Sequence, residues 1–415
     1  MKKILMILLM LPLFGISISL KAQNADEKTV TASGVGSPRD EALNDALRNA
    51  VGQATGIELQ SQTQVENFEL ISDAIQTRVN GYVAGYDIVS ENNREGLVTI
   101  NVKARISTKA LKADAQYLAR AVGGIRFLVM YDEREFKDPA QKAQMDFAVE
   151  RINQYLASKK YRYIEKTRFE QIRREAANIL EDSDTNDLSY VQQLGVKSGA
   201  QFIIMLKGFH TETREQGAFG TKVETQMVMD IKAYDNCTAE GLGTVVLEGP
   251  WKSAYSVDAA NTRNAISETI MTKTDKLMEV FNQYIAEWVN NGTPFELRFM
   301  GSGSFRDLSE LRRRLKADKA FGGQMELVGA EGYMALNCTF RNKPEDLADR
   351  VLSLSDEIEA LKAQRMDVKL IYGRQITFSP GTGGTAPAKS AAVSKTVEAG
   401  KAKKAAAKTV AKKKK

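Results

Sequence analysis

The sequence contains one histidine and two cysteines, and this scarcity limits the chemistry that the chain can support. A zinc site needs clustered His and Cys ligands, which His210, Cys237 and Cys338 cannot supply. A catalytic triad would have to use His210, and no motif around it provides an oriented partner or a nucleophile. We therefore expect a protein that is not an enzyme, with no catalytic residues, no cofactor and no metal.

Acidic residues are scarce at both ends of the chain, where lysines are frequent. Residues 1–23 carry three lysines and no acid, and residues 379–415 carry ten lysines and one glutamate. Because the whole chain has a formal net charge of +6, residues 24–378 have a net charge of −6. The basic character therefore belongs to the two ends, and the body of the protein is mildly acidic.

The first residues have the pattern of a secretory signal peptide. Lys2 and Lys3 precede an apolar run from Ile4 to about Ile18, and polar residues begin after Gln23. We expect cleavage after Ala22 or Gln23; the alternative is an uncleaved anchor, for which the run is short against the ~20 residues of a membrane span. No later stretch approaches that length. The mature protein is expected in the periplasm, and peripheral contact with the outer membrane stays an alternative.

An oxidising compartment leaves two possibilities for the cysteines. Cys237 and Cys338 could form one disulfide, or both could be free and buried. They lie 101 positions apart, in what we interpret as different folded units. This separation favours two free thiols.

The first folded unit is expected at residues 24–120. Strands are predicted at 29–36, 81–90 and 97–106, and helices through residues 42–54 and 65–75. The V-T-A-S-G-V-G run at 30–36, A-L-x-x-A-L-x-x-A-V at 42–51, S-Q-T-Q-V-E-N at 61–67 and G-Y-V-A-G-Y-D-I-V-S at 81–90 resemble the amino-terminal domain of flagellar assembly protein T. The resemblance implies a fold and no catalytic group.

The second unit is expected at residues 121–292, where strands alternate with helices before a meander, as in a layered α/β domain. Strands are predicted at 124–130, 161–165, 201–208, 223–234 and 243–248, and a last helix contains Ile266 to Trp288. The runs at 161–172 and 194–208 resemble the curli secretion lipoprotein G family and the amino-terminal domain of TolB. The connection at about 212–222 is too short and polar for that family's membrane hairpins, so no pore function is implied.

The third unit is expected at residues 293–379. Its order of strands at 295–300, 324–328, 333–340 and 368–378 and helices through 305–315 and 347–361 is βαββαβ, typical of a ferredoxin-like sandwich. The fold class is therefore α+β and multidomain. The expected organisation is a signal peptide at 1–23, folded units at 24–120, 121–292 and 293–379, and a disordered Lys/Ala-rich tail at 380–415.

Four segments are candidate sites with simpler alternatives. Residues 182–186 begin like a calcium loop but lack its glycine and its last glutamate, so a helix-capping loop is favoured. Residues 217–220 form a hairpin tip with no following helix to bind phosphate. The acids Asp132, Glu133, Glu135 and Asp138 could hold a ligand, or could form a solvated loop. Arg312–Arg314 could bind an anion, although consecutive side chains point in different directions, which favours a solvated face.

The tail lacks arginine and aromatic residues, so it has neither forked phosphate ligands nor base-stacking groups. It could serve as a solubilising end, or could attract anionic lipid head groups or envelope polymers without selectivity. Nucleic acid is not an expected partner, because the signal peptide removes the chain from the cytoplasm. The candidate residues are Lys401, Lys403, Lys404, Lys408, Lys412, Lys413, Lys414 and Lys415.

Both resemblances favour a non-enzymatic periplasmic protein that scaffolds or helps to assemble a cell-envelope complex, with other envelope proteins as partners. The alternative is a binding module for an anionic envelope polymer, a lipid head group or a small ligand.

Overall fold

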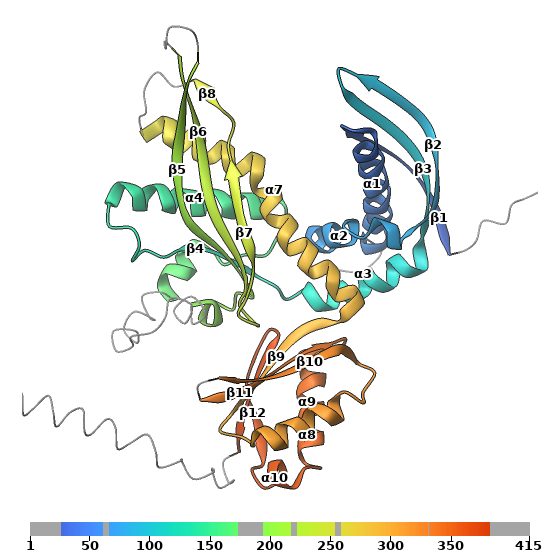
Figure 1. The fold of residues 1–415 in the computed structure, drawn as a ribbon, viewed down its shortest axis with the longest axis vertical. Helices are drawn as coiled ribbons and strands as arrows, with labels where there is room; N and C mark the ends of the chain where they lie inside the picture. Colours follow the sequence, from blue (N-terminus) through green and yellow to red (C-terminus); the bar gives the residue numbers. More distant parts are fainter. Residues whose placement is uncertain are drawn as a thin grey trace, which may run out of the picture.

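The computed structural model describes residues 26–60, 66–172, 194–216, 222–253, 259–330 and 332–381. The predicted signal peptide and the Lys-rich tail lie outside these residues. The described chain forms α+β units that are connected by the long helix α7 (Ala259–Asn291) (Figure 1). This confirms the predicted α+β multidomain class.

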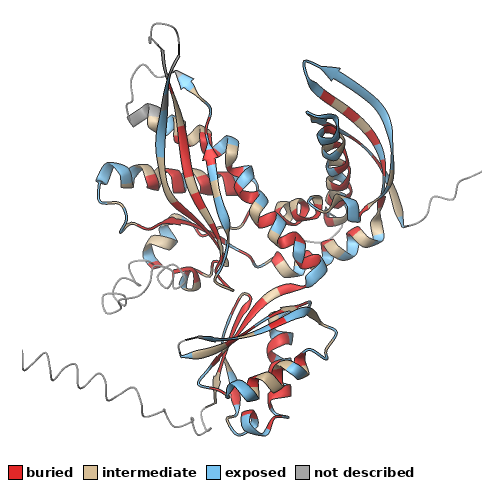
Figure 2. Ribbon diagram, viewed as in Figure 1, coloured by how far each residue is buried: buried red, intermediate tan, exposed pale blue. Residues whose placement is uncertain are grey.

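The first unit is a three-stranded antiparallel sheet with helix α1 on one face. The central strand β3 alternates between buried and exposed residues, and the edge strand β2 is exposed along most of its length (Figure 2). Helix α3 was not predicted, although Leu111, Ala115 and Leu118 repeat at helical spacing and are buried. The elements are β1 (Glu27–Gly36), α1 (Arg39–Gln60), α2 (Phe68–Gln76), η1 (Val79–Gly81), β2 (Val83–Arg94), β3 (Leu97–Ser107) and α3 (Thr108–Val122).

The middle unit has the expected layers. Its sheet has the order β4-β5-β6-β7, with β4 and β5 parallel, and α4 and α7 pack together against it. A second apolar cluster that includes Leu128, Ile172 and Ile203 forms apart from the core under α7. The elements are β4 (Phe127–Tyr131), α4 (Pro139–Ser158), β5 (Phe202–Gln216), β6 (Lys222–Asp235), β7 (Glu240–Glu248) and β8 (Lys252–Ser253), which pairs with β6.

Two details of the middle unit differ from the prediction. The strand predicted at 161–165 is a single bridge between Phe127 and Tyr163, because the chain enters a helical turn at residue 166. The connection predicted at about 212–222 is shorter, because β5 and β6 remain paired out to Gln216 and Lys222. The residues between them lie outside the described part of the chain.

The third unit has a five-stranded sheet of order β10-β11-β9-β13-β12, with its helices on one face. The last predicted strand, 368–378, is a hairpin of two strands, because Gly373 adopts a left-handed φ of 54° and reverses the chain. The second strand pairs in parallel with β9. The elements are β9 (Thr293–Met300), α8 (Phe305–Leu315), β10 (Phe321–Ala330), β11 (Tyr333–Phe340), α9 (Pro344–Ser355), α10 (Glu359–Lys362), β12 (Met366–Tyr372) and β13 (Gln375–Pro380).

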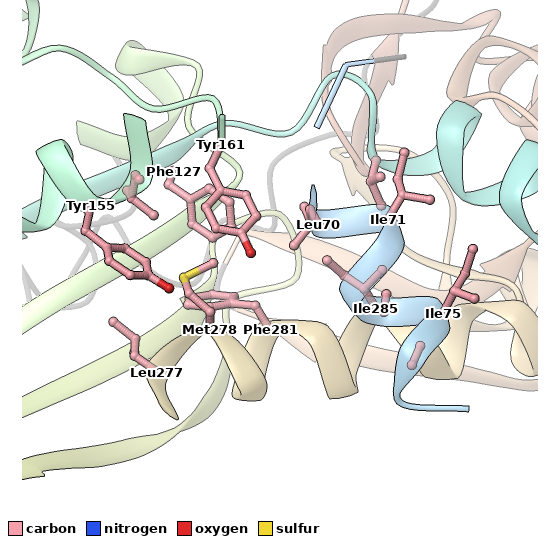
Figure 3. Packing of buried hydrophobic residues seen from close by; sticks show 14 of the residues in the cluster. Leu70, Ile71, Ile75, Phe127, Tyr155, Tyr161, Leu277, Met278, Phe281 and Ile285 are labelled. Carbon is pink, nitrogen blue, oxygen red and sulfur yellow. The ribbon is translucent and has the colours of Figure 1, made fainter. Parts of the chain in front are cut away.

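The first and middle units share one continuous apolar core. Leu70, Ile71 and Ile75 of α2 lie beside Ile285 of α7, and the cluster continues to Phe127 of β4 (Figure 3). The third unit has a separate core around Phe295, Phe299 and Phe378. Helix α7 contacts α2 and α3 on one side, α4, β6 and β7 on another, and β9 at its end. The division into independent units at 120 and 292 stays a prediction.

Candidate functional site at the junction of the units

A buried ion pair joins the third unit to the middle unit. Arg374, in the β12–β13 turn, donates from Nη1 to Oδ2 of Asp235 at 2.5 Å and from Nη2 to Oδ1 at 2.7 Å. The side chains of Arg374 and Asp235 are 3% and 0% exposed. The hydroxyl of Tyr284 on α7 also donates to Asp235, at 2.7 Å. A two-pronged pair of this kind fixes orientation as well as distance.

Aromatic rings surround the cation of this pair. The guanidinium carbon of Arg374 lies 4.7 Å from the ring centroid of Trp288 and 5.4 Å from that of Phe202. Burial by itself would lower the pKa of Arg374, but Asp235 outweighs it, so the pKa is raised above its ordinary value. Arg374 therefore stays charged inside the joint, where the rings favour the cation.

Neighbouring polar groups cross the same joint. Gln375 donates across the joint to the carbonyl of Cys237 at 3.1 Å, and within the third unit to Glu296 at 3.0 Å. Asn236 donates across the joint to the hydroxyl of Tyr372 at 2.8 Å. Separation of the units would break the two bonds that cross the joint and would leave their buried groups without these partners.

The turn that delivers Arg374 needs glycine at one position. Gly373 has a φ of 54°, and a Cβ built there would lie 2.7 Å from Cδ of Gln201, the residue just before β5. Side chains other than glycine rarely adopt this conformation. Gly373 thus lets the hairpin tip approach the middle sheet closely.

A cleft of about 430 Å³ opens beside the ion pair. Tyr117 of α3 hydrogen bonds to Thr293 of β9 across 2.7 Å, and Arg341 donates to the carbonyl of Val289 at the end of α7 at 3.2 Å. Clefts at domain junctions are frequent ligand sites. The walls come from all three units and include Tyr117, Arg120, Gly124, Gln201, Phe295, Arg341, Lys343, Glu345, Asp346 and Gly373.

A second polar network joins the first and middle units around Asp73 of α2. The hydroxyl of Tyr161 donates to Asp73 at 2.8 Å, and Tyr155 donates to Asp275 close by. Burial raises the pKa of Asp73, and the hydrogen bond from Tyr161 acts in the opposite direction. Arg78 extends the junction by donating to Asn290 of α7 at 2.7 Å.

The structure places several predicted candidates beside charged or polar partners within the chain. His210 is exposed on β5, with Nε2 3.6 Å from Glu212. In the acidic loop, Asp132 pairs with Arg134 at 2.6 Å and Glu135 pairs with Lys207 at 2.7 Å. Asp138 caps α4 by accepting from the amide of Ala140 at 3.0 Å.

The cysteine alternatives are resolved in favour of free thiols. Cys237 and Cys338 are both buried and unpaired, so the disulfide alternative is wrong. Burial raises the pKa of each thiol to about 12. Among the described residues, no group of three or more His, Cys, Asp or Glu side chains could hold a metal ion.

Three candidate segments lie outside the described residues: the calcium-like loop at 182–186, the hairpin tip at 217–220 and the tail lysines from Lys401 to Lys415.

The consecutive arginines of α8 lie within the described residues, and their side chains point in different directions. Arg314 pairs with Glu310 and Glu357 at 2.9 and 2.7 Å, whereas Arg312 and Arg313 line a shallow groove. None of the described helices combines the length and the apolar character that a membrane crossing requires.

Sequence reasoning missed the ion pair at the joint. Asp235 is at the end of a strand and Arg374 follows a glycine. Polar residues are common at such positions near turns, so neither residue is conspicuous in the sequence. The one available signal was the Y-G-R-Q sequence at 372–375, where a glycine interrupts an apolar run and indicates a tight turn.

No family model and no curated protein matches the chain. Similar solved structures include a minor lipoprotein from Acinetobacter baumannii, with 12% identity over 39% of this chain and 92% of that chain and a TM-score of 0.20. A hypothetical protein from Chlamydia trachomatis has 15% identity over 40% of this chain and 98% of that chain, with a TM-score of 0.24. A secreted protein from Helicobacter pylori has 9% identity over 62% of this chain and 98% of that chain, with a TM-score of 0.16. Likenesses this weak carry no argument about function, and the resemblances to flagellar assembly protein T, TolB and the curli secretion family stay predictions.

Proposed function

We propose that the protein is a non-enzymatic scaffold or assembly factor of a complex in the cell envelope. The observation that carries the proposal is the buried pair of Asp235 and Arg374, which joins the third unit to the middle unit. A scaffold must hold several binding surfaces at fixed distances and angles, and a buried two-pronged ion pair restricts both.

The rest of the frame supports the same proposal. Helix α7 contacts elements of all three units, and the first and middle units share a core. Domains move relative to each other by default unless their interface is large and hydrophobic. The shared apolar core holds the first and middle units together in this way, which favours a role that depends on orientation. The signal-peptide pattern around Lys2 and Lys3 supports placement in the envelope.

The test is crosslinking in intact cells, followed by affinity isolation of the full-length protein and identification of crosslinked residue pairs. We expect a reproducible set of partners with crosslinks on both the first and third units. In Arg374→Ala, the partners that contact both units should be lost, because the joint is opened. Lys369→Ala, an exposed control on β12 of the same unit, should retain them. A partner set that is unchanged in Arg374→Ala would show that the fixed joint has no role in assembly.

A further inference from the structure

Helix α8 has one apolar face and a polar surface beside it. Leu308, Leu311 and Leu315 are buried in the core of the third unit. The stripe next to these leucines contains Phe305, Ser309, Arg312 and Lys316, at positions i, i+4, i+7 and i+11. Phe305 and Lys316 are exposed, and Ser309 and Arg312 are half-buried. A shallow groove on this side is lined by Arg306, Ser309, Glu310, Arg312, Arg313 and Lys316. We call Phe305, Arg306, Arg312, Arg313 and Lys316 the basic face of α8.

Positive charge on this face exceeds the nearby negative charge. Glu310 is the one acid that lines the groove, and it accepts from Arg313 at 2.6 Å and from Arg314 at 2.9 Å. In the described part of the chain, Arg306, Arg312 and Lys316 have no ion-pair partner. Three cations are therefore available to an external anion.

The neighbouring acids are already engaged. Asp307 accepts from the backbone amide of Ser304 at 2.9 Å in the capping box of α8. Asp318, beyond the end of the helix, pairs with Arg350 of α9 at 3.1 Å. Neither acid therefore neutralises Arg312 or Lys316, so an external anion can pair with them.

An exposed aromatic ring lies at the beginning of the same stripe. Phe305 is 62% exposed, although its neighbours along the helix bury their apolar side chains. A soluble polyanion has no apolar surface against which such a ring could pack. The interface of a bilayer does have one, and an aromatic ring can be buried there beside cationic side chains that contact the head groups. Arginine side chains also match lipid phosphates with two parallel hydrogen bonds.

We propose that the basic face of α8 docks on an anionic phospholipid surface, with Phe305 inserted at the level of the head groups. This binding goes beyond the scaffold role, because it attaches the third unit to a membrane surface without a spanning helix. It is also distinct from the predicted attraction of the tail lysines, because it uses folded residues in a fixed arrangement.

The test is co-sedimentation of the full-length protein, without its predicted signal peptide, with vesicles of phosphatidylglycerol mixed with phosphatidylcholine. One cation near an anionic surface contributes about fivefold to binding. We therefore expect Arg312→Gln/Lys316→Gln to lower the partition coefficient about 25-fold. Lys109→Gln/Lys112→Gln, which removes the same charge from α3 of the first unit, should have little effect. Equal losses in the two double variants would overturn the proposal.

Two further arms distinguish the sources of binding. Deletion of residues 385–415 should lower the overall affinity for vesicles. In this truncated protein, Arg312→Gln/Lys316→Gln should still weaken binding as much as it does in the full-length protein. If the double variant has no effect after the deletion, the binding belongs to the tail. Phe305→Ser should weaken binding to vesicles and leave binding to soluble polyphosphate unchanged. If Phe305→Ser has no effect on vesicles, or lowers both equally, the lipid assignment is wrong. Circular dichroism of each variant checks that the fold is retained.

Discussion

Arg374 and Asp235 lie 139 positions apart in the chain, and they form a two-pronged ion pair that is buried between two units. Burial of such a pair costs free energy because both charges lose water, and loss of one partner costs more. Removal of one partner leaves the other charge without compensation in an apolar setting, whereas replacement of both by apolar residues is often neutral.

We therefore predict that Arg374→Ala lowers the free energy of unfolding by about 3–5 kcal/mol. The cost has two parts: the unpaired carboxylate of Asp235, and the loss of packing against Trp288. Urea denaturation followed by tryptophan fluorescence measures the change, since Trp288 lies at the joint.

The double variant Asp235→Leu/Arg374→Met is the matched control for this prediction. It removes both charges together, so it should be less destabilised than either single variant. Arg313→Ala breaks the exposed pair with Glu310, in which Arg313 is 76% exposed, and should cost ~0–1 kcal/mol. A double variant as unstable as Arg374→Ala would indicate that lost packing, and not the unpaired charge, dominates.

Local patterns in the sequence predicted most of the elements, because apolar spacing reports which face of an element is buried. The alternation through 97–106 and the helical repeat from Ile266 to Trp288 both correspond to observed elements. The hairpin at 366–380 was missed, because one glycine within a long apolar run looks like part of a single strand. Its reversal depends on the left-handed φ of 54° at Gly373, which an apolar pattern does not report.

The candidate site around Asp235 and Arg374 was missed for a different reason. The partners of Arg374 come from β6 and α7, so the site exists only after two units are placed against each other. No local periodicity contains that information. Arg312–Arg314 could be recognised as a candidate because their spacing is local, and the sequence favoured a solvated face for them. The ion pairs that Arg314 forms depend on where Glu310 and Glu357 lie, and the sequence does not show this.

Gly373 provides a second prediction. Gly373→Ala should destabilise the protein by more than the ~1–2 kcal/mol of left-handed backbone strain, because the new Cβ would also contact Gln201. Gly96→Ala is the control: Gly96 has a φ of 84° and open space around it, so only the backbone strain applies. Thermal unfolding of the two variants compares them directly. Equal losses would mean that Gln201 moves aside at little cost.

The thiols provide a third prediction. With pKa values of about 12, both should resist iodoacetamide at pH 8 in the folded protein and react once urea unfolds it. In Arg374→Ala, Cys237 should become labelled faster, because it lies under the opened joint, while Cys338 in the core of the third unit should stay protected. Peptide mass spectrometry separates the two sites. Faster labelling of Cys338 as well would indicate that the whole third unit unfolds.

Asp73 provides the last prediction, which concerns pH. Burial raises its pKa in the folded protein above the unfolded value of about 3.9, so folding favours the protonated form. The stability that this group contributes is therefore complete below about pH 4 and is lost as pH rises through the folded pKa. Asp73→Asn has no such charge and keeps an oxygen that accepts from Tyr161. Its melting temperature, compared with that of wild type, should thus rise between pH 3 and 7, which thermal scans at each pH measure.

The hydrogen bond from Tyr161 gives this prediction an internal control. Because the bond lowers the pKa of Asp73, Tyr161→Phe should raise that pKa further and extend the loss of stability to higher pH. In the Asp73→Asn background, Tyr161→Phe should shift the melting temperature by the same amount at every pH, since no titrating group remains at that position. A pH-dependent shift in that background would assign the effect to another group and refute the role of Asp73.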